Sequence, residues 1–365
     1  MLTRKFSVFS ICFLIIFVLI FAACGSAPDS TSASTSASTS ASKSSSKPGV
    51  QPDWVRDPYT KYDRQANVAA VGSGSDRQKA EKSALGALVA IFGQDIQVDE
   101  KVSVTYQEAA RSGVAAKWSE DTRVDTTYST STGMDSLVGA EIGEVWQDSK
   151  TSTYYAVAVL NKMKAAMVYN DMIKSNQAMI AKLTNMTAAE KNTFEGYSRY
   201  QFAATVADIN VTYGNLLTHI GAPVQGLKRG DDYRLEAVNI TKAIPVALRV
   251  QNDKSNRIQG AFAKALGELG FRTGGTGSRY VLDVNVVTSP VTIANNQNKW
   301  TRIEVSSDLK DTSTNTVIVP YNFSAREGHT TQAEADNRAL VAAERKINED
   351  YAVMLKSFLS QLLPK

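Results

Sequence analysis

The spacing of hydrophobic and polar residues changes along the chain. The first change, from a strand-like run to helical spacing, falls between residues 67 and 92. A short apolar run at 67–71 predicts a strand, and a Gly- and Ser-rich stretch follows it. From 77 to 92 the apolar residues recur every three or four positions, as on one face of a helix. Ser75 or Asp76 is suited to cap the start of this helix, and Gly93 is suited to end it.

The next apolar stretches have the alternation of strands rather than the spacing of a helix. Residues 97–106 predict one such strand. Residues 140–145 and 153–160 predict the two arms of a hairpin, joined by a turn at 147–150. This first part of the fold is therefore expected to run strand, helix, strand, hairpin.

The segment 161–220 has a different character, because it contains no proline and helix-forming residues dominate it. One helix is predicted at 162–183. The sequence Thr187-Ala188-Ala189-Glu190 has the form of a capping box and predicts the start of a second helix. Methionine is concentrated here, where it would fill the seam between the two helices or line an adaptable groove; we favour the seam. These methionines are Met163, Met167, Met172, Met179 and Met186.

The last part of the chain returns to strand-like patterns, and its order again runs strand, helix, strand, hairpin. A long amphipathic helix closes it. The predicted elements are strands at 233–240 and 244–250, a helix at 257–269, a strand at 280–287, a hairpin at 302–309 and 317–323, and a terminal helix at 331–363.

These patterns place the protein in the mixed α+β class. We expect two small α+β modules, at 51–161 and 222–365, separated by a helical hairpin at 162–221. The roughly 315 residues after position 50 are enough for two modest domains.

The start of the chain has the form of a secretory signal, at residues 1–23. Arg4 and Lys5 precede an apolar run of about 16 residues, which ends in Phe21-Ala22-Ala23-Cys24. A cysteine after small residues is typical of a bacterial lipoprotein signal, so we predict cleavage before Cys24 and lipid attachment, including palmitate, at Cys24. An uncleaved anchor is one alternative, although the run is shorter than the roughly 20 residues of a spanning helix. A signal peptide without lipid attachment is the other.

Residues 24–50 are dominated by Ser, Thr and Ala and contain no large apolar residue before Val50. Such a segment cannot bury enough apolar surface to order itself, so we expect a disordered tether. Gly25, rather than Asp, follows the cysteine, and by analogy with enterobacterial sorting this favours the outer membrane. We expect the folded part to face the periplasm, with the cell surface as the alternative.

Charge and cysteine content exclude several classes of function. The whole chain carries 40 basic and 36 acidic residues, and nothing resembles the basic stripe of a nucleic-acid-binding protein. Of its two cysteines, Cys12 would leave with the signal and Cys24 would carry lipid. No thiol would then remain for a disulfide, a metal or a nucleophile.

Candidate chemistry is sparse in the rest of the chain. Gly72-Ser73-Gly74 precedes a helix, but Arg77 stands where a dinucleotide-binding fingerprint has its third glycine. We therefore predict no cofactor, and expect these glycines to let the helix pack closely on the strand.

His219 and His329 have no metal-ligand spacing to other residues, and no GxSxG elbow occurs, so no metal or catalytic residue is predicted. Glu141 and Glu144 lie three apart on a predicted strand, where they would point to opposite faces as solvated charges.

Several motifs together carry a family resemblance over roughly residues 50–165: Trp54, the run Ala69-Ala70-Val71-Gly72-Ser73-Gly74, the Ala-rich helix after it, and Tyr154-Tyr155-Ala156-Val157-Ala158-Val159-Leu160. They resemble the LPP-twenty family of bacterial envelope lipoproteins and the amino-terminal module of flagellar assembly protein T. The last module, in Ile244-Pro245-Val246, Gly270-Phe271 and Leu309-Lys310-Asp311, more distantly resembles modules of the outer-membrane activators of penicillin-binding proteins and of the curli secretion lipoprotein. The resemblance implies roles in assembly, activation or adhesion, and no active site.

We therefore expect a lipid-anchored, non-enzymatic envelope protein. Its partners would be the membrane, through lipidated Cys24, and another envelope protein that it binds as a scaffold or activator. A surface-exposed adhesin or antigen is the alternative, and an enzyme acting on an envelope polymer comes last.

Overall fold

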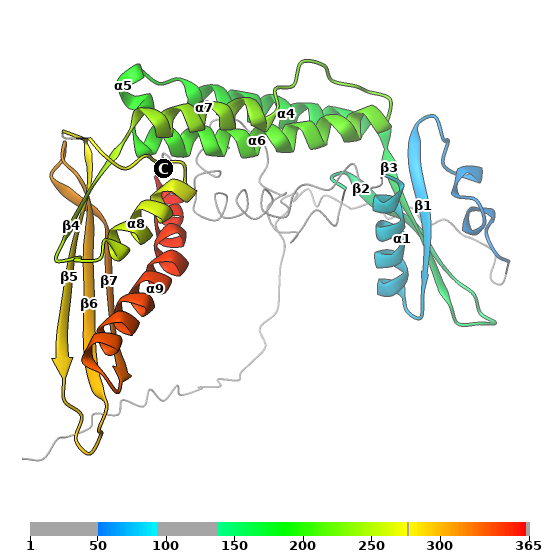
Figure 1. Cartoon of the computed structure of the whole chain (residues 1–365). Coiled ribbons are helices and arrows are strands. Elements are labelled where there is room, and N and C mark those ends of the chain that lie inside the picture. The colour runs from blue at the N-terminus through cyan, green and yellow to red at the C-terminus, as the bar shows by residue number, and fades with distance from the viewer. Residues whose placement is uncertain (1–49, 93–136, 276, 363–365) are drawn as a thin grey trace, which may run out of the picture. The chain divides into compact units, whose positions relative to one another are not determined.

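The computed structural model describes residues 50–92, 137–275 and 277–362, and shows a mixed α+β protein with two small sheets (Figure 1). The signal, the tether with Cys24, Gly93 and the strand predicted at 97–106 lie outside the described residues. Among the described residues, no helix is both long enough and apolar enough to cross a membrane.

The first sheet has the order β1-β3-β2 and is antiparallel throughout. It contains β1 (Asn67–Gly74), β2 (Ala140–Gln147) and β3 (Tyr154–Asn161), which confirms the predicted strand and hairpin. Helix α1 (Arg77–Ile91) packs on one face of this sheet, while Trp54, in a 3₁₀ turn, packs on the other. The Asp76 side chain accepts a hydrogen bond from Lys79 N and so caps α1, as predicted.

Two glycines let α1 approach the sheet closely. They belong to the end of β1 rather than to a turn after it. A Cβ atom on Gly72 would lie 2.1 Å from the backbone nitrogen of Ala84, and one on Gly74 would lie 2.5 Å from that of Ala80. The predicted packing role of these glycines is confirmed.

A β-bulge at Gly143 overturns the prediction for Glu141 and Glu144. Glu141 lies opposite Val159 and Glu144 lies opposite Val157, because the bulge adds one residue to β2 between them. Val157 and Val159 are on the same face of β3, so the two carboxylates also share a face. Glu144 forms an ion pair with Lys61 there.

The middle of the chain forms helices that lie side by side: α4 (Lys162–Thr184), α6 (Phe194–His219) and α7 (Gly230–Ala243) (Figure 1). The strand predicted at 233–240 is wrong, because this segment belongs to α7. Its buried residues Ala237, Ile240 and Thr241 are three and four positions apart, which is helical spacing.

The capping box predicted at Thr187 is present, but the helix that it starts, α5 (Ala188–Lys191), has only four residues. The long second helix, α6, begins later, with Thr193 as its cap. The chain folds back tightly between them: a Cβ atom on Gly196 would lie 2.1 Å from the carbonyl oxygen of Lys191.

The methionines of this region fill the predicted seam only in part. Met179 is buried in the seam where α4 packs on α6. Met163 and Met167 do not fill the seam, because they are 72% and 63% exposed on α4.

The second sheet has the order β4-β5-β6-β7, with β4 parallel to β5 and the other pairs antiparallel. Helix α8 (Arg257–Glu268) connects β4 to β5, and α9 (Gln332–Gln361) follows β7. Both helices cover the same face of the sheet (Figure 1), where Phe262, Tyr321 and Tyr351 pack edge to face. The strands are β4 (Val246–Gln251), β5 (Tyr280–Val291), β6 (Lys299–Asp311) and β7 (Thr316–His329).

The contact of β1 with α1 predicts opposite effects for two glycine substitutions. Gly72→Ala should lower the free energy of unfolding by roughly 1–3 kcal/mol, because the new methyl group overlaps the α1 backbone. Gly86→Ala is the matched control: Gly86 is an exposed position within α1 with no atom within 4 Å of an added Cβ. It should raise stability by about 0.5–1 kcal/mol. Urea unfolding monitored by circular dichroism measures both, and an unchanged midpoint for Gly72→Ala would contradict the close packing.

Candidate functional site

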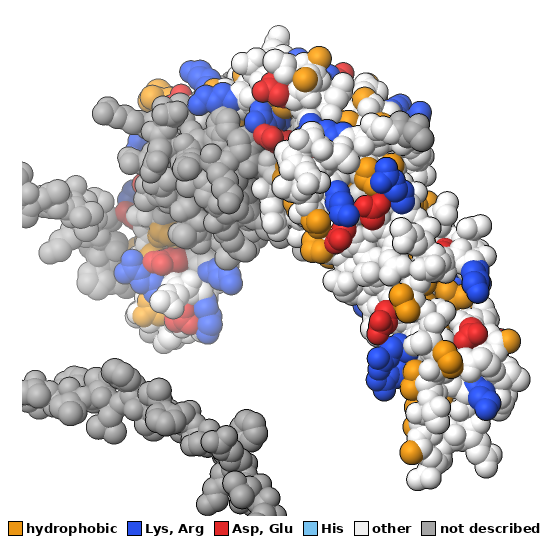
Figure 2. All heavy atoms as spheres, turned by 90° about the vertical axis from the view of Figure 1, so that its left-hand side faces the viewer, with side chains coloured by type: hydrophobic (Ala, Val, Ile, Leu, Met, Phe, Trp, Pro, Cys, Tyr) orange, Lys and Arg blue, Asp and Glu red, His pale blue; other side chains and the backbone are white. Residues whose placement is uncertain are grey.

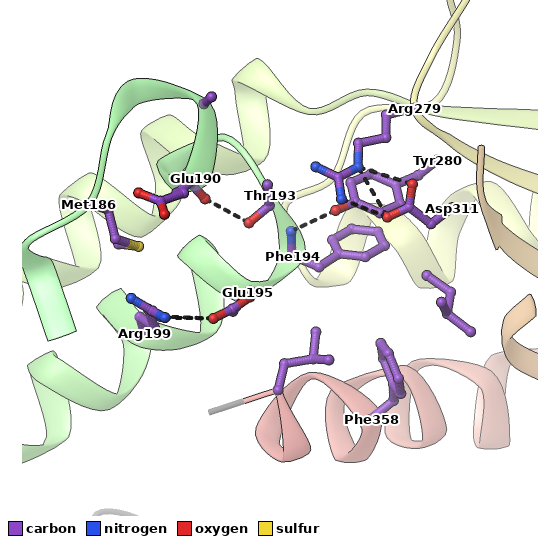
Figure 3. A pocket seen from close by; sticks show the side chains of 13 residues that line it. Met186, Glu190, Thr193, Phe194, Glu195, Arg199, Arg279, Tyr280, Asp311 and Phe358 are labelled. Atoms are coloured by element: carbon purple, nitrogen blue, oxygen red, sulfur yellow. Dashed lines mark hydrogen bonds and ion pairs between the residues drawn. The ribbon is translucent and has the colours of Figure 1, made fainter. Parts of the chain in front are cut away.

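Two adjoining hollows form a groove along the last turns of α9. One has a volume of about 440 Å³ and lies between the α5–α6 corner and the ends of β5, β6 and α9 (Figure 3). The other has a volume of about 580 Å³ and lies between α9 and the start of β7. Ile318 and Phe358 line both hollows, so the two adjoin, and we call them together the α9 groove.

The floor of the α9 groove is apolar. Val353 is 67% exposed, although most apolar residues of α9 face the core. Pro320 is also exposed, and Ile318, Met354 and Phe358 are half-buried. The apolar residues of the floor are Ile318, Pro320, Val353, Met354, Phe358 and Leu362.

The edge strand beside the groove is poorly suited to pair with another strand at this point. β7 is at the edge of the second sheet, and Ile318 is an extra residue in its pairing with β6. Pro320 follows, and proline has no backbone N–H to offer. Bulges and prolines protect edge strands from pairing. Addition of a strand to β7 at this point is therefore disfavoured.

Carboxylates outnumber cations among the residues that line the groove. Two arginines are present, and each is paired: Arg199 lies 2.7 Å from Glu195, and Arg279 lies 2.7 Å from Asp311 (Figure 3). Lys346, next to the groove, is shared by the two carboxylates of α9, at 3.8 Å and 3.0 Å. The lining therefore has more carboxylates than cations, although most of these carboxylates are ion-paired. The five carboxylates of the lining are Glu190, Glu195, Asp311, Glu349 and Asp350.

Aromatic contacts hold the α5–α6 corner against the second sheet. The rings of Phe194 and Tyr280 are stacked, with centroids 3.8 Å apart, and Phe271 meets Phe194 edge on. The Phe194 backbone N–H also donates a hydrogen bond of 3.1 Å to the Tyr280 hydroxyl (Figure 3). One wall of the groove is therefore rigidly joined to the sheet.

Asp311 is the most strongly perturbed carboxyl group of the groove. Burial opposes its ionisation, but hydrogen bonds from Arg279 and Ser313 outweigh burial and lower the pKa of Asp311 to about 2. Arg279 donates to both carboxylate oxygens, and Ser313 donates through its N–H and its hydroxyl. These contacts hold the loop after β6 and the start of β5 together.

The residues examined in the sequence do not come together in one site. Gly72 and Gly74 pack α1 on its sheet, His219 ends α6 and meets Phe92 edge on, and His329 ends β7. In the described part of the chain, no group of three or more His, Cys, Asp or Glu could hold a metal ion. Cys24 lies outside that part.

Sequence reasoning missed the α9 groove. The predicted amphipathic helix at 331–363 contains Met354 in its apolar stripe, and Val353 lies next to this stripe and is exposed. An exposed valine beside a helix stripe is a weak signal by itself. It becomes informative only with the position of β7, which sequence spacing does not reveal.

Comparisons with known proteins give only distant similarities. No protein-family model matches the sequence, and no curated protein matches it. Among solved structures, a secreted protein of Helicobacter pylori is 12% identical, with a TM-score of 0.37 over 78% of this chain and 98% of that chain. A minor lipoprotein of Acinetobacter baumannii is 16% identical, with a TM-score of 0.24 over 32% of this chain and 93% of that chain.

A lipoprotein of Neisseria meningitidis is 13% identical, with a TM-score of 0.19 over 29% of this chain and 99% of that chain. The structures to which this chain is similar thus include secreted proteins and lipoproteins. At these TM-scores the similarity carries no argument about function, and the resemblance to the LPP-twenty family stays a prediction.

The lowered pKa of Asp311 predicts a pH-dependent difference between the protein and its Asp311→Asn variant. At pH 7 the variant should be less stable by roughly 1–2 kcal/mol, because the ionised carboxylate is favoured in the folded state. A pKa below the ordinary value of 3.8 stabilises the fold above about pH 5, and this contribution is lost as the pH falls towards 2. Unfolding free energies of both proteins should therefore converge at low pH. A difference that stays constant from pH 7 to pH 2 would contradict this assignment.

Proposed function

We propose that this protein is a lipid-anchored, non-enzymatic lipoprotein of the bacterial envelope that binds another envelope protein as a scaffold or activator. Its predicted lipid, at Cys24, would hold it in the outer membrane, and the Ser-rich tether would carry the folded part into the periplasm. The α9 groove is the proposed binding surface.

The observation that carries this proposal is the row of apolar side chains in the α9 groove. Val353 is exposed, and Met354 and Phe358 lie beside it on the same helix. Water contact with such side chains costs free energy, which a partner recovers by covering them, at about 25 cal/mol per Å². Acidic and basic side chains are interspersed over the described surface that faces the viewer in Figure 2, so its charge offers no comparable one-signed patch.

The chemistry of the groove indicates the kind of partner. Its apolar side chains call for a segment with apolar side chains on one face, and its excess of carboxylates over cations calls for lysine or arginine at the edges of that face. The stretch of α9 from Glu349 to Leu362 is on the order of 20 Å long, at 1.5 Å per residue. A basic amphipathic helix of three to four turns in the partner would match this length and chemistry.

Crosslinking from the groove tests this function. A photoreactive amino acid at position 353, in living cells, should form one discrete crosslinked product. The matched control is position 341, because Val341 is also an exposed valine of α9, at 44%, but it does not line the groove.

Val353→Asp should abolish the crosslink from a neighbouring groove position, whereas Val341→Asp should leave it unchanged. Both substitutions are at exposed positions, so folding is expected to be retained. Equal products from positions 341 and 353, or none from 353, would contradict the groove as the binding surface.

The lipid anchor has its own test. Cys24→Ala should abolish palmitate labelling, because Cys24 is the predicted attachment residue. Cys12→Ala is the control, since Cys12 lies in the predicted signal and its loss should leave labelling intact. Palmitate label that persists in Cys24→Ala would rule out attachment at this residue.

A further inference from the structure

A third hollow, of about 340 Å³, lies where α4, α6 and α7 meet, and both polar and apolar side chains line it. We call it the polar hollow. It is distinct from the α9 groove, because no residue lines both. The side chains that matter for its chemistry are Gln177 and Thr184 of α4, Asn210 of α6, Lys228 of the connecting loop and Tyr233 of α7.

A buried amide at the wall of this hollow has unused hydrogen-bonding capacity. Asn210 is only 2% exposed, and its side-chain oxygen accepts a hydrogen bond of 2.8 Å from Asn176. Its Nδ2 group has no partner among the described residues, although Asn210 lines the hollow. Because Asn210 lines the hollow, its amide N–H groups can donate hydrogen bonds to an acceptor bound there.

The walls of the polar hollow are held in place by contacts outside it. Asp208 of α6 accepts a hydrogen bond of 2.9 Å from Gly230 N and forms an ion pair with Arg234, which fixes the start of α7. Leu227 packs closely on α6 because Gly214 has no Cβ, which would lie 2.7 Å from Leu227 Cδ1. The hollow is therefore preformed, which reduces the cost of binding a ligand.

The charge of the lining indicates what kind of ligand fits. Lys228 is the one charged residue among the described residues that line the hollow, and it is exposed at the rim. Gln177 and Tyr233 each carry both a donor and an acceptor. An amide donor in the wall and a cation at the rim together favour a carboxylate.

We propose that the polar hollow binds a small carboxylate, either a free amino acid or the carboxyl end of a short peptide. Its volume is at the lower end of the range for small-molecule sites, which suits a ligand of this size. The two sources share the carboxylate and differ in the group attached to it. The proposal does not depend on the α9 groove.

The test uses the whole mature chain and three probes: alanine, N-acetyl-alanyl-alanine, and the carboxamide of that dipeptide. The side-chain amide signals of Asn210 in a nitrogen–proton correlation spectrum report binding at the hollow. At least one acid should cause a saturable shift, and the carboxamide should bind at least tenfold more weakly than the dipeptide acid. A preference for alanine or for the acetylated dipeptide distinguishes a free amino acid from a peptide end.

Lys228→Gln should weaken binding of the acid several-fold without changing the fold, because Lys228 is exposed. Lys242→Gln is the matched control, since Lys242 is an exposed lysine of α7 that does not line the hollow. The double variant Asn176→Leu with Asn210→Leu replaces the buried pair by apolar side chains and should abolish binding while the helices stay folded.

Three results would overturn the proposal. The first is the absence of a saturable shift with either acid at millimolar concentration, which would mean that water alone fills the hollow. The second is equal binding of the dipeptide acid and its carboxamide. The third is binding that Lys228→Gln leaves unchanged.

Discussion

Helix α6 is the element on which the rest of the structure depends, because it carries buried side chains around its whole circumference. A helix that is apolar on all sides has to be covered on all sides. Its first residue, Phe194, lies in the core of the second sheet, and Leu216 and Leu217 near its end lie in the core beneath α1. Helices α4 and α7 pack along its sides. The buried residues of α6 therefore require a neighbouring element on every side.

The two surface features follow from how α6 is covered. At its start, the stacked rings of Phe194 and Tyr280 hold the α5–α6 corner against the sheet, and the α9 groove is the space that remains beside this joint. Along the length of α6, α7 and the loop before it leave a space next to α4. This space is the polar hollow, which Asn210 lines. The first feature combines apolar side chains with more carboxylates than cations, and the second combines polar and apolar side chains around one lysine.

Local sequence patterns were sufficient to predict the elements that depend on one helix face or one hairpin. The caps at Asp76 and Thr187 and the helix at 257–269 were predicted because their signals lie within a few neighbouring residues. The prediction failed at 233–240, where a short β-like run was taken for a strand. There Ala237 and Ile240 are buried on one face of α7, and Gly230 N at the start of α7 donates a hydrogen bond to Asp208. Both features stabilise a helix. The bulge at Gly143 was missed for a similar reason, since only pairing with β3 reveals it.

The sequence by itself determined the mixed α+β class, the order of most elements and the lipoprotein-like start of the chain, because each depends on residue types within a short stretch. Tertiary structure alone decided where the α9 groove and the polar hollow lie. The α9 groove joins Met186 to Phe358, and the polar hollow joins Gln177 to Lys228. Residues so far apart in the chain become neighbours only when helices and sheets pack, and packing depends on shape and burial that no local pattern encodes.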